Sequence, residues 1–304
     1  VGGGLIGIEL AEMLPSRHTP VTFLVREQNF WEGVLPTKNA QLLNKHILSQ
    51  GIDLRLNTEL KEVFGESNGR VKSILTNHNE HIDCDLVGIA TGVQPNIDFI
   101  KNSSIHTDKG VLVNKYLETN IPGIYAIGDC AQQTEVSGQR KPIETAWYTG
   151  RMMGETLAQT ICGNKIAYKP GHWFNSAKFF EVEYQTYGWV NSDHRKPEYE
   201  AHFHWQHTTE NIALCLAYHK DSQVLLGVNS FGMRLRHVVL DGWLTEQRTL
   251  EYVLAHWADA LFDPEFTKNQ LPELLDTYQK TFGKTLQPLK KNWSRILNPF
   301  KKSL

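Results

Sequence analysis

The chain has 304 residues, of which 40% are hydrophobic and 21% charged, a balance typical of a folded protein with two or three compact units. Its formal net charge of −2 gives no overall attraction to nucleic acid. No apolar run reaches the roughly 20 residues that cross a bilayer, so we expect no transmembrane helix. Four scattered cysteines form no close pair, which argues against a disulfide scaffold and predicts a cytoplasmic location: Cys84, Cys130, Cys162 and Cys215.

Predicted helices and strands alternate over the first third of the chain. A glycine-rich run, residues 2–7, precedes a predicted helix at residues 8–14. Short apolar runs predict buried strands at 21–25, 52–56 and 86–90, with a helix at 38–50 that stops at Gly51 and an antiparallel hairpin at 63–77. This alternation predicts a doubly wound α/β domain, to which we assign residues 1–97.

Two further units are predicted after it. Residues 98–168 contain predicted strands at 110–113 and 124–127 and a helix from about 143 to 161, which Gly163 and Asn164 would end. From residue 169 we expect antiparallel strands at 179–190, 199–207, 212–219 and 224–230, then two or three helices, the clearest at 246–262. Residues 169–304 are therefore predicted to form an α+β C-terminal domain with an antiparallel sheet.

The opening glycines have the spacing Gly2-x-Gly4-x-x-Gly7. Gly2 would permit a tight turn, Gly4 would let a pyrophosphate approach the backbone, and Gly7 would let the helix pack closely on a strand. Alone such a motif is also compatible with an ordinary turn, but a helix and a strand follow at the expected distance. The strand that should precede the glycines is represented only by Val1, so we expect the intact protein to have residues before it.

The residue that follows the second strand of such a domain reports the choice of cofactor. An acidic side chain there accepts a hydrogen bond from the ribose of NAD, whereas an arginine suits the 2′-phosphate of NADP. Val25 stands where the carboxylate is expected, and Arg26 and Glu27 follow it. Arg26 favours NADPH; the alternative is that Arg26 is a solvated charge and Glu27 acts as the carboxylate.

Three motifs occur in order: Gly2-Gly3-Gly4-x-Ile6-Gly7-x-Glu9, then Ala90-Thr91-Gly92-x-x-Pro95-Asn96, then Thr119-x-x-Pro122-Gly123-Ile124-Tyr125-Ala126-Ile127-Gly128-Asp129. Together they resemble the pyridine nucleotide–disulfide oxidoreductase superfamily, which includes glutathione reductase, ferredoxin reductases, NADH oxidases and nitrite-reductase flavoprotein domains. The resemblance covers residues 1 to about 165. It implies a Rossmann-type nicotinamide-cofactor domain, followed by the C-terminal part of an FAD-binding domain whose N-terminal half is not in this sequence.

The resemblance also implies roles for individual residues. Gly2, Gly4, Gly7 and Gly92 would contact the nicotinamide cofactor, and Asp129 would hold the ribityl chain of FAD, with Gly128 giving backbone clearance. Glu9 resembles a glutamate near the site of hydride transfer, and Thr145 and Ala146 open the helix that faces the flavin ring. An N-cap is the alternative role for Asp129, and an ordinary first-turn helix acid is the alternative for Glu9.

Two departures from the family are informative. A redox-active CxxxxC pair would lie before Val1, so its absence from this sequence decides nothing. The C-terminal His-x-x-x-x-Glu pair of glutathione reductase relatives has no convincing counterpart, which argues against a dithiol reductase. Residues 169–176 instead resemble the aromatic segment that opens the third domain of ferredoxin-reductase-like members, where aromatic side chains lie near the flavin; packing at a domain seam is an equal alternative.

Two other patterns point less clearly to function. His202, His204 and His207 lie in one predicted strand, but no acidic or cysteine ligand completes a set, so we expect solvent-facing histidines and no metal. The basic segment 284–304 carries interleaved apolar residues and could touch a membrane surface or an acidic partner, although packing on the C-terminal domain is favoured.

The sequence thus predicts an FAD-dependent oxidoreductase that passes a hydride from NAD(P)H to FAD, and electrons on to a small-molecule or redox-protein acceptor. A homodimer is compatible with this prediction. The alternative is a non-catalytic nucleotide-binding or assembly module that needs another chain for flavin binding. A flavin-free dehydrogenase would leave Asp129 unexplained.

Overall fold

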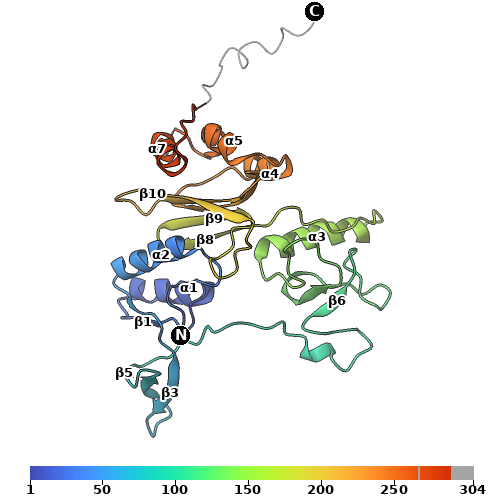
Figure 1. Ribbon diagram of the computed structural model, residues 1–304. Coiled ribbons are helices and arrows are strands. Elements are labelled where there is room, and N and C mark those ends of the chain that lie inside the picture. The colour runs from blue at the N-terminus through green and yellow to red at the C-terminus, as the bar shows by residue number, and fades with distance from the viewer. Residues whose placement is uncertain (266–267, 289–304) are drawn as a thin grey trace, which may run out of the picture.

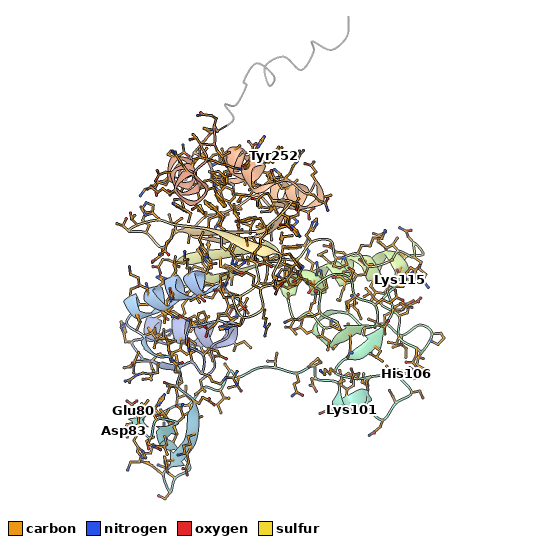
Figure 2. All side chains as sticks on the ribbon, viewed as in Figure 1. Glu80, Asp83, Lys101, His106, Lys115 and Tyr252 are labelled. Atoms are coloured by element: carbon orange, nitrogen blue, oxygen red, sulfur yellow. The ribbon has the colours of Figure 1, made fainter. Side chains whose placement is uncertain are left out.

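The structure is a computed structural model that describes residues 1–265 and 268–288. We refer to residues 1–97 as the N-terminal unit, 98–168 as the middle unit and 169–288 as the C-terminal unit. In Figure 1 these units run from blue through green to red, and side chains fill the layers between the helices and the sheet of the C-terminal unit (Figure 2).

The N-terminal unit begins with helix α1 (Leu5–Met13), strand β1 (Thr22–Leu24), helix α2 (Thr37–Ser49) and strand β2 (Asp53–Arg55). Strands β1 and β2 pair in parallel, with Thr22 opposite Asp53. Strands β3 (Leu60–Gly65), β4 (Val71–Thr76) and β5 (His81–Asp83) form an antiparallel sheet that projects from the unit (Figure 1). These elements confirm the predicted helix at 38–50, the parallel strands and the hairpin.

The predicted buried strand at 86–90 is wrong. Leu86 and Ile89 are 71% and 66% exposed, and the segment contains no strand. It is tied to the sheet only through Val1, whose N-terminal amine donates to Gly88 O (2.8 Å) and whose carbonyl accepts from Ala90 N (2.8 Å). These two hydrogen bonds join the segment to Val1 alone and make no continuous ladder, so the segment is not a strand.

The opening glycines form a tight turn that places α1 against β1. Gly2 has φ of 118°, a left-handed value that favours glycine, and its N–H donates to Leu24 O (3.0 Å). A Cβ on Gly7 would lie 2.1 Å from Gly2 O and 3.1 Å from the Phe23 ring, whereas a Cβ on Gly4 would have nothing within 4 Å. Gly7 therefore serves close packing and Gly4 borders open space, as their spacing predicts.

The middle unit is small. It contains the 3-10 turns Asp98–Ile100 and Gly128–Cys130, strands β6 (Val111–Val113) and β7 (Ala131–Gln133), which pair in parallel, and helix α3 (Trp147–Ile161). The predicted strand at 124–127 is reduced to a single bridge between Glu118 and Tyr125. Helix α3 ends as predicted, at Cys162 with Gly163 at φ 91°, but starts later than residue 143, because Ala146 is extended at φ −138° and ψ 133°.

The C-terminal unit is a five-stranded antiparallel sheet covered on one face by helices. Its strands are β8 (Phe174–Phe179), β9 (Val182–Gly188), β10 (Glu200–Gln206), β11 (Ala213–His219) and β12 (Leu225–Phe231), in the order β10-β11-β12-β9-β8. The single strand predicted at 179–190 is wrong at its start, since Phe180, at φ 53°, turns the chain between β8 and β9.

The helices of this unit are α4 (His237–Thr245), α5 (Leu250–Ala255), α6 (Trp257–Ala260) and α7 (Leu271–Phe282). The predicted continuous helix at 246–262 is wrong: Gln247, at φ 51°, ends the turn after α4, and Thr249 caps α5 by accepting from Tyr252 N (3.3 Å). Helix α4 is one of the two or three helices expected here, but no range was predicted for it: its Val238, Val239 and Gly242 lower helix propensity, and packing on the sheet offsets that cost.

The other face of this sheet packs on the N-terminal unit, where α1 and α2 lie against β8 and β9 (Figure 1). One buried cluster joins the two units, with Phe23, Phe30 and Ile47 from the first and Phe179 and Tyr184 from the second. Polar contacts cross the same boundary: His46 Nε2 lies 3.1 Å from Phe179 O, and Glu12 accepts from Phe180 N (3.1 Å). The first and last parts of the described chain therefore share a core.

A loop of the C-terminal unit caps a helix of the N-terminal unit. Helix α2 has Pro36 at its N-cap and no side-chain cap of its own, and Asp193 Oδ2 accepts from Thr37 N (2.8 Å). Burial alone would raise the pKa of Asp193, but hydrogen bonds from Thr37 and the nearby charge of Lys196 outweigh burial and hold the pKa below its usual range.

Replacing Asp193 by Ala should lower the free energy of unfolding by about 1 kcal/mol at neutral pH, since the Thr37 N–H at the start of α2 loses its side-chain acceptor. The depressed pKa means that this contribution is present above the unfolded pKa, about 3.9, and disappears as pH falls through the folded value. Urea unfolding at several pH values measures the loss of stability and its dependence on pH. Asp221→Ala, in an exposed turn, is the control. Equal stabilities of the Asp193 and Asp221 variants would contradict the cap.

The two glycines of the turn give a matched pair of substitutions. Gly7→Ala should destabilise the protein by roughly 1–3 kcal/mol, because its methyl group would overlap Gly2 O. Gly4→Ala should cost less than about 1 kcal/mol, since its methyl group enters open space. Thermal unfolding followed by circular dichroism checks this order, and an equal loss in both variants would be inconsistent with close packing at Gly7.

Candidate functional site

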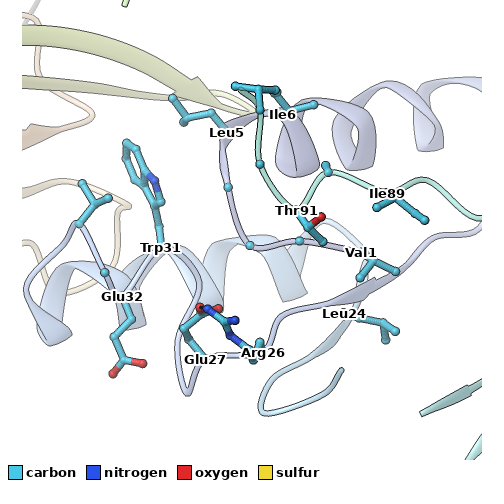
Figure 3. A pocket seen from close by; sticks show the side chains of 18 of the residues that line it. Val1, Leu5, Ile6, Leu24, Arg26, Glu27, Trp31, Glu32, Ile89 and Thr91 are labelled. Atoms are coloured by element: carbon cyan, nitrogen blue, oxygen red, sulfur yellow. Dashed lines mark hydrogen bonds and ion pairs between the residues drawn. The ribbon is translucent and has the colours of Figure 1, made fainter. Parts of the chain in front are cut away.

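A cavity of about 810 Å³ lies at the carboxyl ends of β1 and β2, beside the N-terminus of α1 (Figure 3). The residues that line it are 1–6, Glu9, Leu24, Arg26, Glu27, 31–34, 58–60 and 89–93, with Asp129 and Thr145 of the middle unit. This is the edge of a parallel α/β sheet where ligands gather, and the volume is in the range of small-molecule and cofactor sites.

Most of the residues predicted from the sequence lie in this one cavity. Those that line it are Gly2, Gly4, Glu9, Arg26, Glu27, Gly92, Asp129 and Thr145. Three do not line it: Gly7 lies beneath the turn, Gly128 donates its N–H to Met153 Sδ (3.3 Å), and Ala146 is the buried N-cap of α3. The cavity thus brings residues expected at the nicotinamide cofactor together with residues expected at the flavin.

The glycine turn offers backbone donors to an anion. No side chain among the described residues caps α1, so the N–H groups of its first turn are free for a ligand. The open space around Gly4 lies at this end of the helix, where the helix dipole favours negative charge. A pyrophosphate fits these features.

Charges of both signs lie at the end of the cavity beyond β1. Arg26 Nη2 contacts Glu27 Oε1 at 2.9 Å, and the arginine side chain is 71% exposed. The hydrogen bond with Glu27 raises the pKa of Arg26, and the charge of Glu59 acts in the same direction. Arg26 is therefore already paired, and two carboxylates surround it.

Trp31 and Glu32 line the same cavity and were not predicted. Trp31 has φ of 59°, which is uncommon for a bulky side chain. The Glu32 carboxylate is buried and accepts from Gln28 N (3.1 Å) and Asn29 Nδ2 (3.2 Å), and His194 Nε2 lies 3.2 Å away. Burial favours the neutral acid, but these hydrogen bonds outweigh it and lower the pKa of Glu32. No spacing in the sequence signals either residue, since both depend on a loop folded against the C-terminal unit.

A buried arginine fastens the middle unit to the start of the C-terminal unit. Arg140 Nη1 contacts Glu144 Oε2 at 2.7 Å, and Nη2 donates to three successive carbonyls, those of Pro170, Gly171 and His172, at 3.0–3.1 Å. Burial raises the pKa of Glu144, although the charge of Arg140 opposes the shift. Because Glu144 directly precedes Thr145, this cluster fixes the chain just before α3.

The predicted aromatic segment lies beside this cluster. The Trp173 and Trp189 rings stack at 5.7 Å, the Arg140 guanidinium lies 5.5 Å from the Trp173 ring, and Tyr148 Oη lies 2.7 Å from Ser176 Oγ. The rings therefore line the seam between the middle and C-terminal units. Both interpretations of them, flavin neighbours and seam packing, agree with this position.

The sequence predicts that the histidines of this region face solvent. For His202 and His204, which lie in β10, this prediction is wrong. The His202 side chain is 7% exposed and lies 2.7 Å from Glu200 Oε1, and burial lowers the pKa of His204 to about 3. They belong to the sheet face that carries Cys215, opposite His204 in register. Within residues 1–265 and 268–288, no cluster of three His, Cys, Asp or Glu side chains could hold a metal ion.

Two further observations concern predicted contacts with membranes. Among the described residues no helix is long and apolar enough to cross a bilayer. Most of the basic segment 284–304 lies outside the described residues, so its expected packing is not described by the structure.

The described residues fit both cofactors in part. The glycine turn and the cavity suit a dinucleotide, and Asp129 and Thr145 supply oxygen acceptors where the middle unit borders the same cavity.

Comparison with known proteins agrees with these features. A family described as pyridine nucleotide-disulphide oxidoreductase matches residues 1–154. Rubredoxin-NAD(+) reductase of Acinetobacter baylyi is 34% identical over 159 residues, which cover 52% of this chain and 40% of that protein. NADH oxidase of Streptococcus pyogenes is 27% identical over 297 residues, 88% of this chain and 61% of the relative. The chain thus spans roughly half the length of these curated relatives.

Solved structures share the fold. The NAD-dependent persulfide reductase from A. fulgidus has a TM-score of 0.74 at 20% identity, over 93% of this chain and 55% of that one. Putidaredoxin reductase, in its covalent complex with putidaredoxin, has a TM-score of 0.67 at 19% identity, over 81% and 57% of the two chains. On the family match and the fold, the chain belongs to the pyridine nucleotide-disulphide oxidoreductase family.

Proposed function

We propose that the protein takes a hydride from NADH onto FAD and passes electrons on to a redox acceptor. The observation that supports this most is the composition of the cavity, in which the glycine turn and Gly92 share one space with Asp129 and Thr145. Hydride transfer needs the nicotinamide and the flavin in contact, and one cavity bordered by residues suited to each meets that requirement.

The roles of the side chains follow from their positions. The first-turn N–H groups of α1 would bind the pyrophosphate, and the Asp129 carboxylate would accept hydrogen bonds from flavin hydroxyls. Glu9 is exposed, lines the cavity and makes no ion pair within the described ranges, so it is free to orient a polar group at the nicotinamide end. Bound flavin supplies the two-electron chemistry, and the protein supplies position and exclusion of water.

The charges of the cavity favour NADH over the NADPH that Arg26 alone predicts. A 2′-phosphate at Arg26 would have to displace Glu27 and would lie near both Glu27 and Glu59. Two carboxylates against one guanidinium repel a dianion, whereas the Glu27 carboxylate can accept from a ribose hydroxyl. The names of the relatives, an NAD(+) reductase and an NADH oxidase, support the same choice.

For the electron acceptor we propose only a chemical class. Relatives are named for rubredoxin and for a flavorubredoxin, and a neighbour in structure was crystallised with putidaredoxin. A redox protein is therefore the proposed class of acceptor, with a small molecule as the alternative. The cytoplasmic location expected from the scattered cysteines stays a prediction.

Adding NADH anaerobically to the purified full-length protein should bleach the flavin absorbance at about 450 nm. Asp129→Ala should lower the ratio of bound flavin to protein several-fold, because the hydroxyl acceptor is lost, while Asp98→Ala, an exposed residue of the middle unit, should not. Full-length protein that binds NADH but holds no flavin would instead support a nucleotide-binding module that depends on another chain.

Glu27→Gln should raise the ratio of kcat/KM for NADPH to that for NADH by about fivefold, since it removes one charge that repels the 2′-phosphate and frees Arg26. Reduction of ferricyanide by each nucleotide measures the ratio, and Glu66→Gln on the exposed hairpin is the control. Wild-type preference for NADPH, or no change in the Glu27 variant, would refute this account of specificity.

A further inference from the structure

The segment that leads into helix α3 separates two cavities. Thr145 lines the cavity of about 810 Å³ at the glycine turn, whereas Arg140 and Glu144 line a second cavity of about 270 Å³. The neighbouring residues Glu144 and Thr145 therefore border different sides of the same segment. Whatever holds Glu144 on one side also decides where Thr145 lies on the other.

The side chains of this segment alternate between buried and exposed positions. Ala146 is extended at φ −138° and ψ 133°, and successive side chains of an extended backbone point to opposite faces. Glu144 and Ala146 are 9% and 8% exposed, while Thr145 is exposed and Trp147 is 69% exposed. A shift of the segment by one residue would exchange these two faces and would remove Thr145 from the cavity.

Arg140 fixes Glu144 on the buried face. Arg140 Nη1 contacts the carboxylate at 2.7 Å, and both side chains are at most 8% exposed. Because Nη2 of the same guanidinium donates to the carbonyls of residues 170–172, the carboxylate is tied to the first residues of the C-terminal unit. The Thr149 hydroxyl donates to the carbonyl of Ala146 (2.8 Å) and holds the backbone at the end of the segment.

Stability alone does not account for a buried ion pair at this position. Burial disfavours the charged carboxylate, and the pKa of Glu144 is raised even beside Arg140. Apolar side chains of similar size would fill the same space, often without loss of stability, but they would have no preferred direction. A bonded ion pair has a specific geometry, and that geometry determines which side chains of the segment lie on each face.

We propose that Arg140 and Glu144 are positioning residues, which hold the segment in the register that places Thr145 at the cofactor cavity. This inference rests on the proposed function, in which Thr145 borders the flavin. Neither Arg140 nor Glu144 lines that cavity, so they act on the cofactor through the chain that they hold. Removal of the pair should weaken flavin binding and spare nucleotide binding, since the glycine turn belongs to the N-terminal unit.

A double-mutant cycle on FAD affinity tests the proposal. Titration of the full-length protein, stripped of flavin, with FAD compares the wild type, Thr145→Val, an apolar-pair variant (Arg140→Met with Glu144→Leu) and the combination of all three substitutions. Thr145→Val should weaken FAD about fivefold when the pair is present, because one hydrogen bond is lost. It should weaken FAD less than about twofold in the apolar-pair variant, where the hydroxyl no longer faces the cavity.

Controls test whether the effect is local. Asp276→Leu with Lys280→Met removes an exposed pair of the same i,i+4 spacing in α7 and should leave FAD affinity unchanged. NADH affinity should stay at the wild-type value in every variant. Circular dichroism checks that each variant is folded, and Glu144→Gln, which keeps the size of the side chain but removes its charge, replaces the apolar-pair variant in the cycle if that variant does not fold.

Each outcome bears on the inference. A smaller effect of Thr145→Val without the ion pair than with it supports positioning. Equal effects in both backgrounds, wild-type FAD affinity in the apolar-pair variant, or a parallel loss of NADH affinity would overturn the inference and leave the proposed function intact. Wild-type full-length protein that binds no FAD would overturn the proposed function and the inference together.

Discussion

The Phe30 and Phe179 rings meet at a centroid distance of 5.8 Å in a core that neither end of the chain could form alone. One ring comes from the loop after β1 and the other from the end of β8. Around them Phe23, Tyr184 and Phe231 complete an apolar layer between the α/β unit and the antiparallel sheet. Burial of these large side chains is the main force that joins the two units, because apolar area removed from water is the dominant favourable contribution to folding.

The candidate site depends on this layer. The loop from Arg26 to Pro36 borders the cavity on one side and packs on the C-terminal sheet on the other, so the sheet determines where Trp31 and Glu32 stand. The cavity is thus not a property of the glycine turn alone. The turn provides the backbone donors, and residues far along the chain set the space in front of them.

The middle unit is attached in a different way. Its link to the C-terminal unit is polar, with the Arg140 guanidinium shared between Glu144 and three backbone carbonyls. A buried ion pair contributes little net stability because desolvation of both charges offsets their attraction, but its geometry is specific. It fixes the approach of Thr145 and α3, which is what a site assembled from separate units requires.

The sequence by itself determined many of the local elements and the identity of eight of the residues that line the cavity. Regular apolar spacing identified α2 and the parallel strands β1 and β2, and glycine spacing identified Gly2 and Gly4, because these signals depend on neighbouring residues. Gly92 and Asp129 came from the resemblance of the three ordered motifs to a known family. It failed at residues 86–90, whose apolar character predicts burial but whose strand needs a longer partner than Val1. It failed also at residues 246–262, which the turn at Gln247 and the cap at Thr249 set apart from α4 and which form two short helices.

Only the tertiary structure determined which side chains from distant parts of the sequence enclose the cavity and which charges lie beside it. The sequence sets Arg26 beside Glu27, but the ion pair between their side chains and the effect of the Glu59 charge on Arg26 are seen only in the folded chain, since charges distant in sequence act through space. The position of Trp31 depends on Phe179 and Tyr184, residues about 150 positions away that no local pattern connects to it. Short sequence motifs reveal the chemistry of neighbouring residues. The shape of a site and its electrostatic field instead depend on side chains that come into contact only when the chain has folded.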